Sequence, residues 1–232
     1  MNDKPRGETS AARLRHRLSV RLTHWLGAVG VTGLFATDFG ILISHPRLYW
    51  GETGTVGMPS LIDLPLPFII GPSVWNRPIH FFFAWILVLT GIAYYGAALC
   101  TRHLREDLLP AKGELSKARV MHILGAHLRW RRTPEDGGHT YNIVQKLSYL
   151  AVIFVIVPAI LWTGLAMSPA LMTAFPFIVT ILGGHQSART LHFLFVLLLL
   201  VFVIAHLAML FLVGFRAHVR AMITGSMPGG AP

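Results

Sequence analysis

Two histidines lie within a long apolar segment near the end of the sequence. His192 and His206 are the only ionisable side chains between Thr190 and Phe215, and a helix of this length can cross a hydrocarbon core of about 30 Å. Fourteen residues separate them, which corresponds to about 21 Å along the helix axis and returns both to nearly the same face. Histidines inside a membrane are costly and usually functional. We therefore expect two sites at two depths, each completed by a partner elsewhere in the chain.

The composition is that of an integral membrane protein. Hydrophobic residues make up 53% of the 232 residues and charged residues only 13%, which excludes an ordinary soluble domain. The single cysteine, Cys100, excludes an intrachain disulfide framework, a cluster held by cysteines of this chain alone, and a haem attached through C-x-x-C-H. No cleavable signal peptide is expected, because the first apolar segment is long enough to span the membrane.

Hydropathy predicts an all-α integral membrane fold, with one membrane domain over residues 1–232 that forms a four-transmembrane-helix bundle. The predicted spans are about 24–44, 79–99, 143–167 and 190–215. Between them lie connectors 45–77 and 168–189 on one side and a polar loop, 101–142, on the other. The connectors contain apolar stretches that are interrupted by prolines and are too short to cross. Pro158 is expected to kink the third span.

The distribution of positive charge predicts the orientation. The N-terminal arm, residues 101–146 and the C-terminal tail share one side and hold 17 of the 20 Lys and Arg residues. Only Arg47, Arg77 and Arg189 lie on the other side. The positive-inside rule therefore places both termini in the cytoplasm. A basic face toward anionic lipids accounts for the net charge of +10 without nucleic acid as a partner.

This topology predicts two pairs of histidines. His80 and His192 lie near the outer surface and form the outer pair, whereas His24 and His206 lie near the cytoplasmic surface and form the inner pair. Such an arrangement suits two b-type haems, each ligated by two imidazoles between facing helices. Zinc fits less well, because no third or fourth ligand is evident for either pair. The alternative is a haem-free anchor or transporter in which the histidines only stabilise helix contacts.

Other polar residues suggest further contacts with these cofactors. Arg21, Arg77 and Arg189 adjoin the paired histidines and could bind haem propionates, or extend toward the membrane surface instead. Asp38 is the one acid within a span; it lies at the depth of the outer pair, where we expect it to remain hydrated. Alternatively, Asp38 could form a hydrogen bond to a haem edge or take part in proton movement.

Small residues in the spans have two interpretations. They could let a macrocycle approach the backbone or could allow ordinary packing between helices. These residues are Gly27, Gly30, Gly33, Gly91 and Gly164.

The paired histidines and their neighbouring residues resemble the bacterial diheme cytochrome b family. This family includes the membrane subunits of respiratory formate dehydrogenase, nickel-iron hydrogenase and thiosulfate reductase. Beyond the four-span layout, the resemblance rests on Leu22-Thr23-His24-Trp25, Asn76-Arg77-Pro78-Ile79-His80, Tyr141-Asn142-Ile143-Val144-Gln145-Lys146, Thr163-Gly164-Leu165-Ala166-Met167 and the two histidines of the last span.

The resemblance implies a protein of the bacterial inner membrane that carries electrons between an outer-face oxidoreductase and the quinone pool and also anchors that partner. The partner would be of the molybdenum, iron-sulfur or hydrogenase type. The quinone is expected near the inner haem, with Asn142, Gln145 and His206 as candidate contacts and Lys146 and Tyr141 as weaker candidates. The alternative for Asn142 is a helix cap. A rival function is a self-contained haem b enzyme that oxidises a small outer-face reductant such as superoxide and reduces quinone.

Overall fold

The computed structural model describes residues 17–55, 57–67, 73–101, 109–110, 115–129, 131 and 142–225. Four of its helices are long and apolar enough to cross a membrane: Leu18–Ser44, Val74–Cys100, Ile143–Ala166 and His185–Val213. The predicted all-α, multi-pass membrane fold is confirmed.

Three of the membrane helices begin earlier than hydropathy predicts. Helix α1 covers Leu18–Ser44, α2 covers Ser73–Cys100 with Pro78 inside it, and α8 covers His185–Val213. Their first turns contain polar or charged residues, which a hydropathy criterion assigns to the loops. A helix continues through such residues because its backbone hydrogen bonds form equally well in the interfacial region beyond the hydrocarbon core.

The third span is a composite helix. It consists of α4 (Ile143–Ala151), a π-helical turn η3 (Val152–Ile156) and α5 (Val157–Ala166). Pro158 lies in the first turn of α5, where it has no backbone N–H to donate to the preceding turn. The hydroxyl group of Tyr95 on α2 donates a hydrogen bond to the carbonyl of Ile153 within η3. The irregularity expected at Pro158 therefore takes the form of a π-helical turn just before it.

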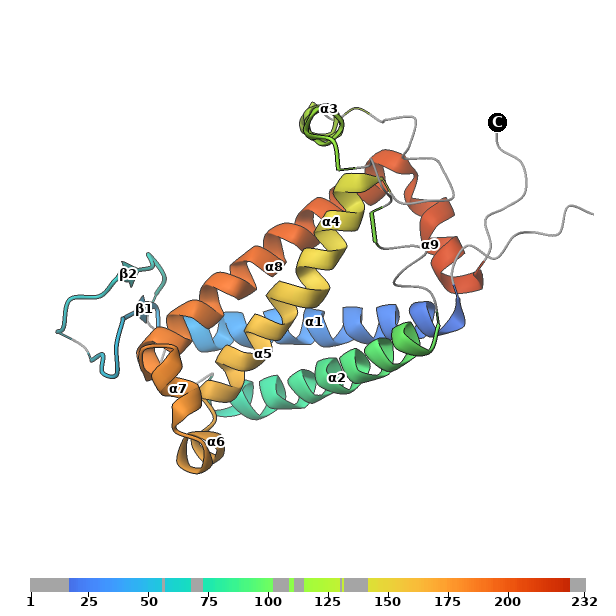
Figure 1. Ribbon diagram of the computed structural model, residues 1–232. Coiled ribbons are helices and arrows are strands. Elements are labelled where there is room, and N and C mark those ends of the chain that lie inside the picture. Colours follow the sequence, from blue (N-terminus) through green and yellow to red (C-terminus); the bar gives the residue numbers. More distant parts are fainter. Residues whose placement is uncertain are drawn as a thin grey trace, which may run out of the picture.

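The connectors gather at one end of the molecule, which we call the connector end (Figure 1). There, β1 (Arg47–Leu48) pairs antiparallel with β2 (Ile62–Asp63), and the short helices α6 (Pro169–Ala174) and α7 (Phe177–Ile181) precede α8.

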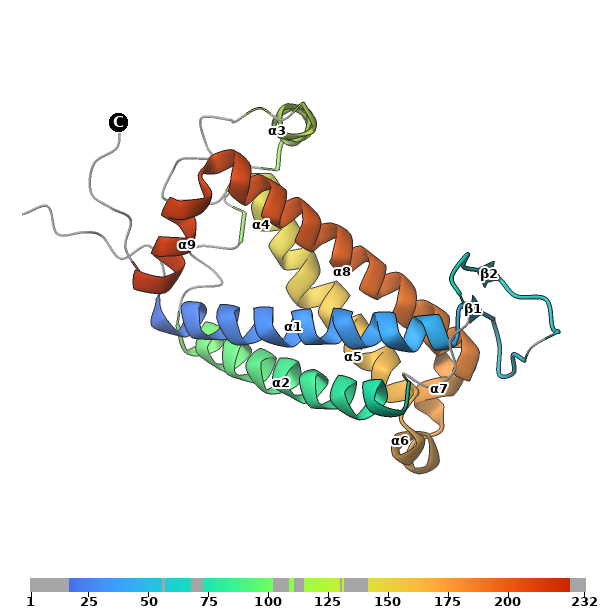
Figure 2. The same cartoon turned by 180° about the vertical axis from the view of Figure 1, so that it is seen from behind.

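Helix α3 (Lys117–Leu128), which was not predicted within the polar loop, lies at the opposite end with α9 (Phe215–Thr224) (Figure 2). The last span ends at Val213 rather than at residue 215, because Gly214 has a φ of 129° and interrupts the helix.

The four membrane helices form two closely packed pairs. Helix α1 packs along α2, and α5 packs along α8, whereas backbone contacts between the two pairs are sparse. Gly33 allows the close packing of α1 on α2, since a Cβ atom at this position would overlap the ring of Phe83. An apolar cluster joins the two pairs near mid-length: Val31 and Phe35 of α1 pack against a core that includes Leu199.

The loop after α1 is fastened to the start of α8. The buried hydroxyl group of Ser187 accepts a hydrogen bond from the backbone N–H of Gly51 at 2.8 Å, and that of Thr190 donates to the carbonyl of Tyr49 at 2.6 Å. Gly184 precedes α8 with a φ of 114°, and a Cβ atom there would lie 2.5 Å from the backbone of Gly51. These contacts fix the end of α8 that carries His192 relative to the end of α1.

Candidate functional site

The structure brings the four predicted histidines together in two pairs. The ring centres of His80 on α2 and His192 on α8 are 6.3 Å apart, with an interplanar angle of 67°. Those of His24 on α1 and His206 on α8 are also 6.3 Å apart, with an angle of 59°. The outer pair lies toward the connector end and the inner pair toward α9. In each histidine pair, one ring belongs to the α1–α2 helix pair and the other to α8.

This separation fits two imidazoles that ligate the same iron atom. A metal–imidazole nitrogen bond of about 2.0 Å, with the ring centre about 1.1 Å behind the nitrogen, places the two ring centres about 6 Å apart. Imidazole nitrogen is a common ligand of haem iron, and two histidines can hold one haem. The donor set and the spacing of both pairs therefore fit bis-histidine haem.

The ring of His192 is oriented by hydrogen bonds at Nδ1. This nitrogen lies 2.9 Å from Oγ1 of Thr163 and 3.1 Å from the carbonyl oxygen of Ile160. The Thr163 hydroxyl group donates its own proton to the carbonyls of Ala159 and Ile160, so it can accept one from Nδ1. The contacts at Nδ1 favour the tautomer whose Nε2 carries the free lone pair, as a metal ligand requires.

His80 has the same arrangement on the opposite helix pair. Its Nδ1 lies 3.2 Å from Oγ1 of Thr37 and 3.3 Å from a carboxylate oxygen of Asp38. Thr37 donates its proton to the carbonyls of Gly33 and Leu34, so both neighbouring oxygens can accept from the imidazole. The expectation that Asp38 simply remains hydrated is wrong, because its side chain is only 25% exposed and contacts a paired histidine.

Asp38 also gives the outer pair a third group with metal-ligand chemistry. Its carboxylate and the nitrogens of His80 and His192 lie within 4.8 Å of one another. The expectation that neither pair has a third such group is therefore wrong for the outer pair. The carboxylate faces Nδ1 of His80, however, which leaves Nε2 for a metal and makes Asp38 a hydrogen-bond acceptor of the ligand.

The inner pair is surrounded by aromatic rings instead. The ring of His206 stacks on Phe202 at 5.9 Å and 20° and lies 6.4 Å from the ring of Tyr149, while that of His24 lies 5.4 Å from Trp25. Within the described ranges, neither His24 nor His206 forms a hydrogen bond through its side chain. The two pairs thus share a spacing but differ in polarity.

Two of the three predicted propionate-binding arginines lie at the connector end. Arg189 donates to the carbonyl of His45 at 2.5 Å, and Arg77 is exposed. Partial burial lowers the pKa of His45, and the nearby guanidinium groups of Arg189 and Arg77 lower it further. Positive charge is therefore concentrated beside the outer pair.

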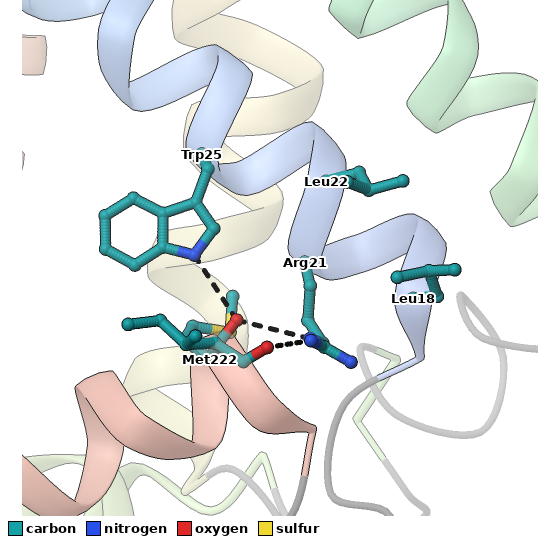
Figure 3. Close-up of a pocket in the computed structure, with 6 residues that line it drawn as sticks. Leu18, Arg21, Leu22, Trp25 and Met222 are labelled. Carbon is teal, nitrogen blue, oxygen red and sulfur yellow. Dashed lines mark hydrogen bonds between the residues drawn. The ribbon is translucent and has the colours of Figure 1, made fainter.

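The third arginine, Arg21, is used to hold α9 against α1. Its guanidinium group donates to the carbonyls of Met222 and Ile223, and the indole of Trp25 also donates to Met222 (Figure 3). An open, mainly apolar pocket of about 390 Å³ lies between these helices. It borders the inner pair through Trp25.

Most of the small residues in the spans serve helix packing. Gly30 and Gly33 of α1 face α2, where added Cβ atoms would meet Ile86 and Phe83. A Cβ atom added to Gly27 would lie 4.0 Å from Cγ2 of Thr90. Gly164 is different, because a Cβ atom there would lie 3.3 Å from Cε1 of His192. Among the five glycines named from the sequence, all of which the structure describes, only Gly164 lies close to a paired histidine.

Asn142 and Gln145 form a capping box at the start of α4. The Asn142 side chain accepts a hydrogen bond from the backbone N–H of Gln145 at 2.9 Å, and the Gln145 side chain accepts from the backbone N–H of Asn142 at 3.2 Å. The alternative of a helix cap is confirmed. Both amide oxygens accept hydrogen bonds within the cap. A hydrogen bond donated to a ligand would come from the NH₂ groups of these two side chains. Tyr141 lies outside the described residues.

The contacts of two threonines with the outer pair were not predicted from the sequence, although Thr163 lies in one of the motifs that carry the family resemblance. Thr37 and Thr163 are 6% and 1% exposed, each beside a histidine from another helix. A hydroxyl group in a membrane span was the available signal, but most threonines in helices bond only to their own preceding turn.

Comparisons with known proteins identify the family of this chain. Residues 15–225 match the prokaryotic cytochrome b561 family. The chain is 29% identical over 194 residues to the "Putative protein-methionine-sulfoxide reductase subunit YedZ1" of Azospira oryzae, covering 84% of this chain and 88% of that protein. No solved structure gives a significant match. The chain belongs to the prokaryotic cytochrome b561 family and is a membrane haem b electron-transfer protein.

Proposed function

We propose that this protein is a diheme b-type cytochrome subunit that carries electrons between an outer-face oxidoreductase and the quinone pool. The observation that carries the proposal is the presence of two histidine pairs, each 6.3 Å between ring centres, at opposite ends of one bundle. His192 and His206 on α8 are about 21 Å apart along the axis by helix rise. One helix would thus contribute a ligand to each of two haems stacked across the membrane.

Each haem would supply a one-electron iron couple. The residues of this chain hold and insulate it: His80 and His192 would ligate the outer haem, and His24 and His206 the inner haem. An apolar cluster that includes Leu199 lies between the two pairs. Arg77 and Arg189 are the candidates to bind propionates of the outer haem, and Arg189 would have to exchange its contact with the carbonyl of His45 to do so. Arg21 is occupied by α9 in this structure and would have to exchange these contacts to bind a propionate of the inner haem.

The quinone is proposed to react near the inner pair. Asn142 and Gln145 are the candidate contacts, and their amide NH₂ groups would donate hydrogen bonds to the quinone carbonyls. The pocket between α1 and α9 is a second place where a quinone ring could approach, because its wall includes Trp25, the neighbour of His24 in the chain and in space.

The partner is proposed to bind at the connector end, which the positive-inside rule places outside the inner membrane. Exposed apolar side chains in this region, including Trp50, Met58 and Leu61, are available for contact with a protein or with lipid. The name of the Azospira oryzae relative, a reductase subunit, supports a protein partner over a self-contained enzyme that oxidises superoxide. Electron transfer through haem is compatible with a partner of the molybdenum, iron-sulfur or hydrogenase type.

Haem stoichiometry tests this proposal. The purified protein, expressed with adequate haem supply, should contain two b-type haems per chain with two resolvable reduction potentials. A preparation with one haem per chain under these conditions would overturn the diheme function.

A further inference from the structure

We propose that Asp38 is a positioning residue for the outer haem, whose carboxylate accepts the Nδ1 proton of His80 and thereby lowers the reduction potential of that haem. This inference rests on the proposed diheme function. It assigns a role to Asp38, which is the only acidic residue within the four spans.

The contact is specific in geometry. A carboxylate oxygen of Asp38 lies 3.3 Å from Nδ1 of His80, and the two side chains are 25% and 14% exposed. Asp38 follows Thr37, whose hydroxyl oxygen lies 3.2 Å from the same nitrogen. Two neighbouring residues of α1 therefore present acceptors to one imidazole of α2, which orients the ring with Nε2 available for the iron.

A carboxylate acts on the iron differently from a hydroxyl or a carbonyl group. Hydrogen bonding to an anion draws the Nδ1 proton away from the imidazole, which makes the ring a stronger electron donor. The negative charge also stabilises the ferric state, which carries one more positive charge than the ferrous state. Both effects favour oxidised iron and lower its reduction potential.

The other paired histidines provide an internal comparison. Among the described residues, the hydrogen-bond contacts of Nδ1 of His192 are with neutral oxygens, from Thr163 and Ile160. The rings beside His24 and His206 are aromatic, and within the described part of the chain no acidic group contacts either one. The influence of Asp38 should therefore be confined to the outer haem.

The test is the substitution Asp38→Asn, with Asp63→Asn as its matched control. Asp63 is also at the connector end, but it is exposed and paired with Arg47. Potentials of both haems are measured in the full-length protein, and a variant lacking His206 identifies which potential belongs to the outer haem. We expect D38N to raise the potential of the outer haem and to change its ferric low-spin resonance signal, with the inner haem unchanged. D63N should alter neither.

Unchanged potentials in D38N with both haems present, or a shift of the inner haem, would overturn the role of Asp38 while leaving the diheme function intact. If D38N loses the outer haem, Asp38→Glu decides the matter. Retention of the outer haem at or below the wild-type potential in D38E supports the proposal. An upward shift or loss of haem in D38E, despite the retained carboxylate, contradicts it. A wild-type protein with fewer than two haems would instead refute the proposed function itself.

Discussion

Nδ1 of His192 lies 2.9 Å from Oγ1 of Thr163, and the corresponding nitrogen of His80 lies 3.2 Å from Oγ1 of Thr37. Each threonine uses its own proton within its helix and offers a lone pair to a histidine from another helix. The outer pair is thus held by matching threonines on α1 and α5. Because the ligand orientation is set by these neighbours, changes beside the histidines should affect the outer haem selectively.

Replacing Thr163 with Val removes one of the two acceptors at Nδ1 of His192 while preserving side-chain shape. We expect about a 10-fold loss in affinity for the outer haem, the lower end of the range for groups that hydrogen-bond to metal ligands, since the Ile160 carbonyl remains. Haem titration of the apoprotein measures this effect. Thr32→Val is the matched control, because Thr32 is exposed and its hydroxyl group donates to the carbonyl of Ala28 in its own helix. An equal loss in T32V, or loss of the inner haem in T163V, would contradict this prediction.

Gly164→Ala should disturb the same ring by steric contact. The added Cβ atom would lie 3.3 Å from Cε1 of His192, so the imidazole must shift by a few tenths of an ångström. We expect lower occupancy of the outer haem and a broadened low-spin resonance signal. Gly91→Ala is the control, because its added Cβ would meet no described atom within 4 Å outside its chain neighbours and its own helix backbone. Both substitutions raise helix propensity by about 1 kcal/mol. Equal occupancy and identical spectra in the two variants would count against the proposed haem position.

Asn142→Asp separates the capping role from the proposed quinone contact. The carboxylate can still accept the backbone hydrogen bond of the cap, but the NH₂ donor is lost. We expect haem content close to wild type, with a several-fold slower reaction with quinone in stopped-flow measurements. Normal quinone kinetics in N142D would remove this residue from the quinone site. Slower kinetics in Trp25→Leu alone would place quinone in the pocket between α1 and α9 instead.

The four spans and the histidine pairs could be predicted because their signals are strong and local. Apolar segments of membrane-crossing length identify the spans, and helix periodicity places His192 and His206 on one face at two depths. Alternation of the spans across the membrane then leaves one partner at each depth, which are His80 and His24. In the structure, the ring centres of these same histidines are 6.3 Å apart within each pair.

The remaining features depend on contacts between helices, which a single sequence does not specify. Asp38 and Thr37 are adjacent in α1, but their contact with His80 requires the rotation and depth at which α1 packs on α2. Helix α3 has only 12 residues and mixes basic with apolar side chains, so a search for segments of membrane-crossing length does not detect it. The π-helical turn at Val152–Ile156 follows from Pro158 together with packing around it, and Pro158 alone predicts only a kink.

Selective loss of haem from single-histidine variants tests the central claim most directly. Each of His24, His80, His192 and His206 is replaced with Ala in the full-length protein, and His218→Ala on α9 serves as the control. Haem content, spectra and potentials are then compared. We predict that H80A and H192A lose one and the same haem, that H24A and H206A lose the other, and that H218A retains both. Loss in any other combination, such as H80A and H206A lacking the same haem, would contradict the pairing on which this account rests.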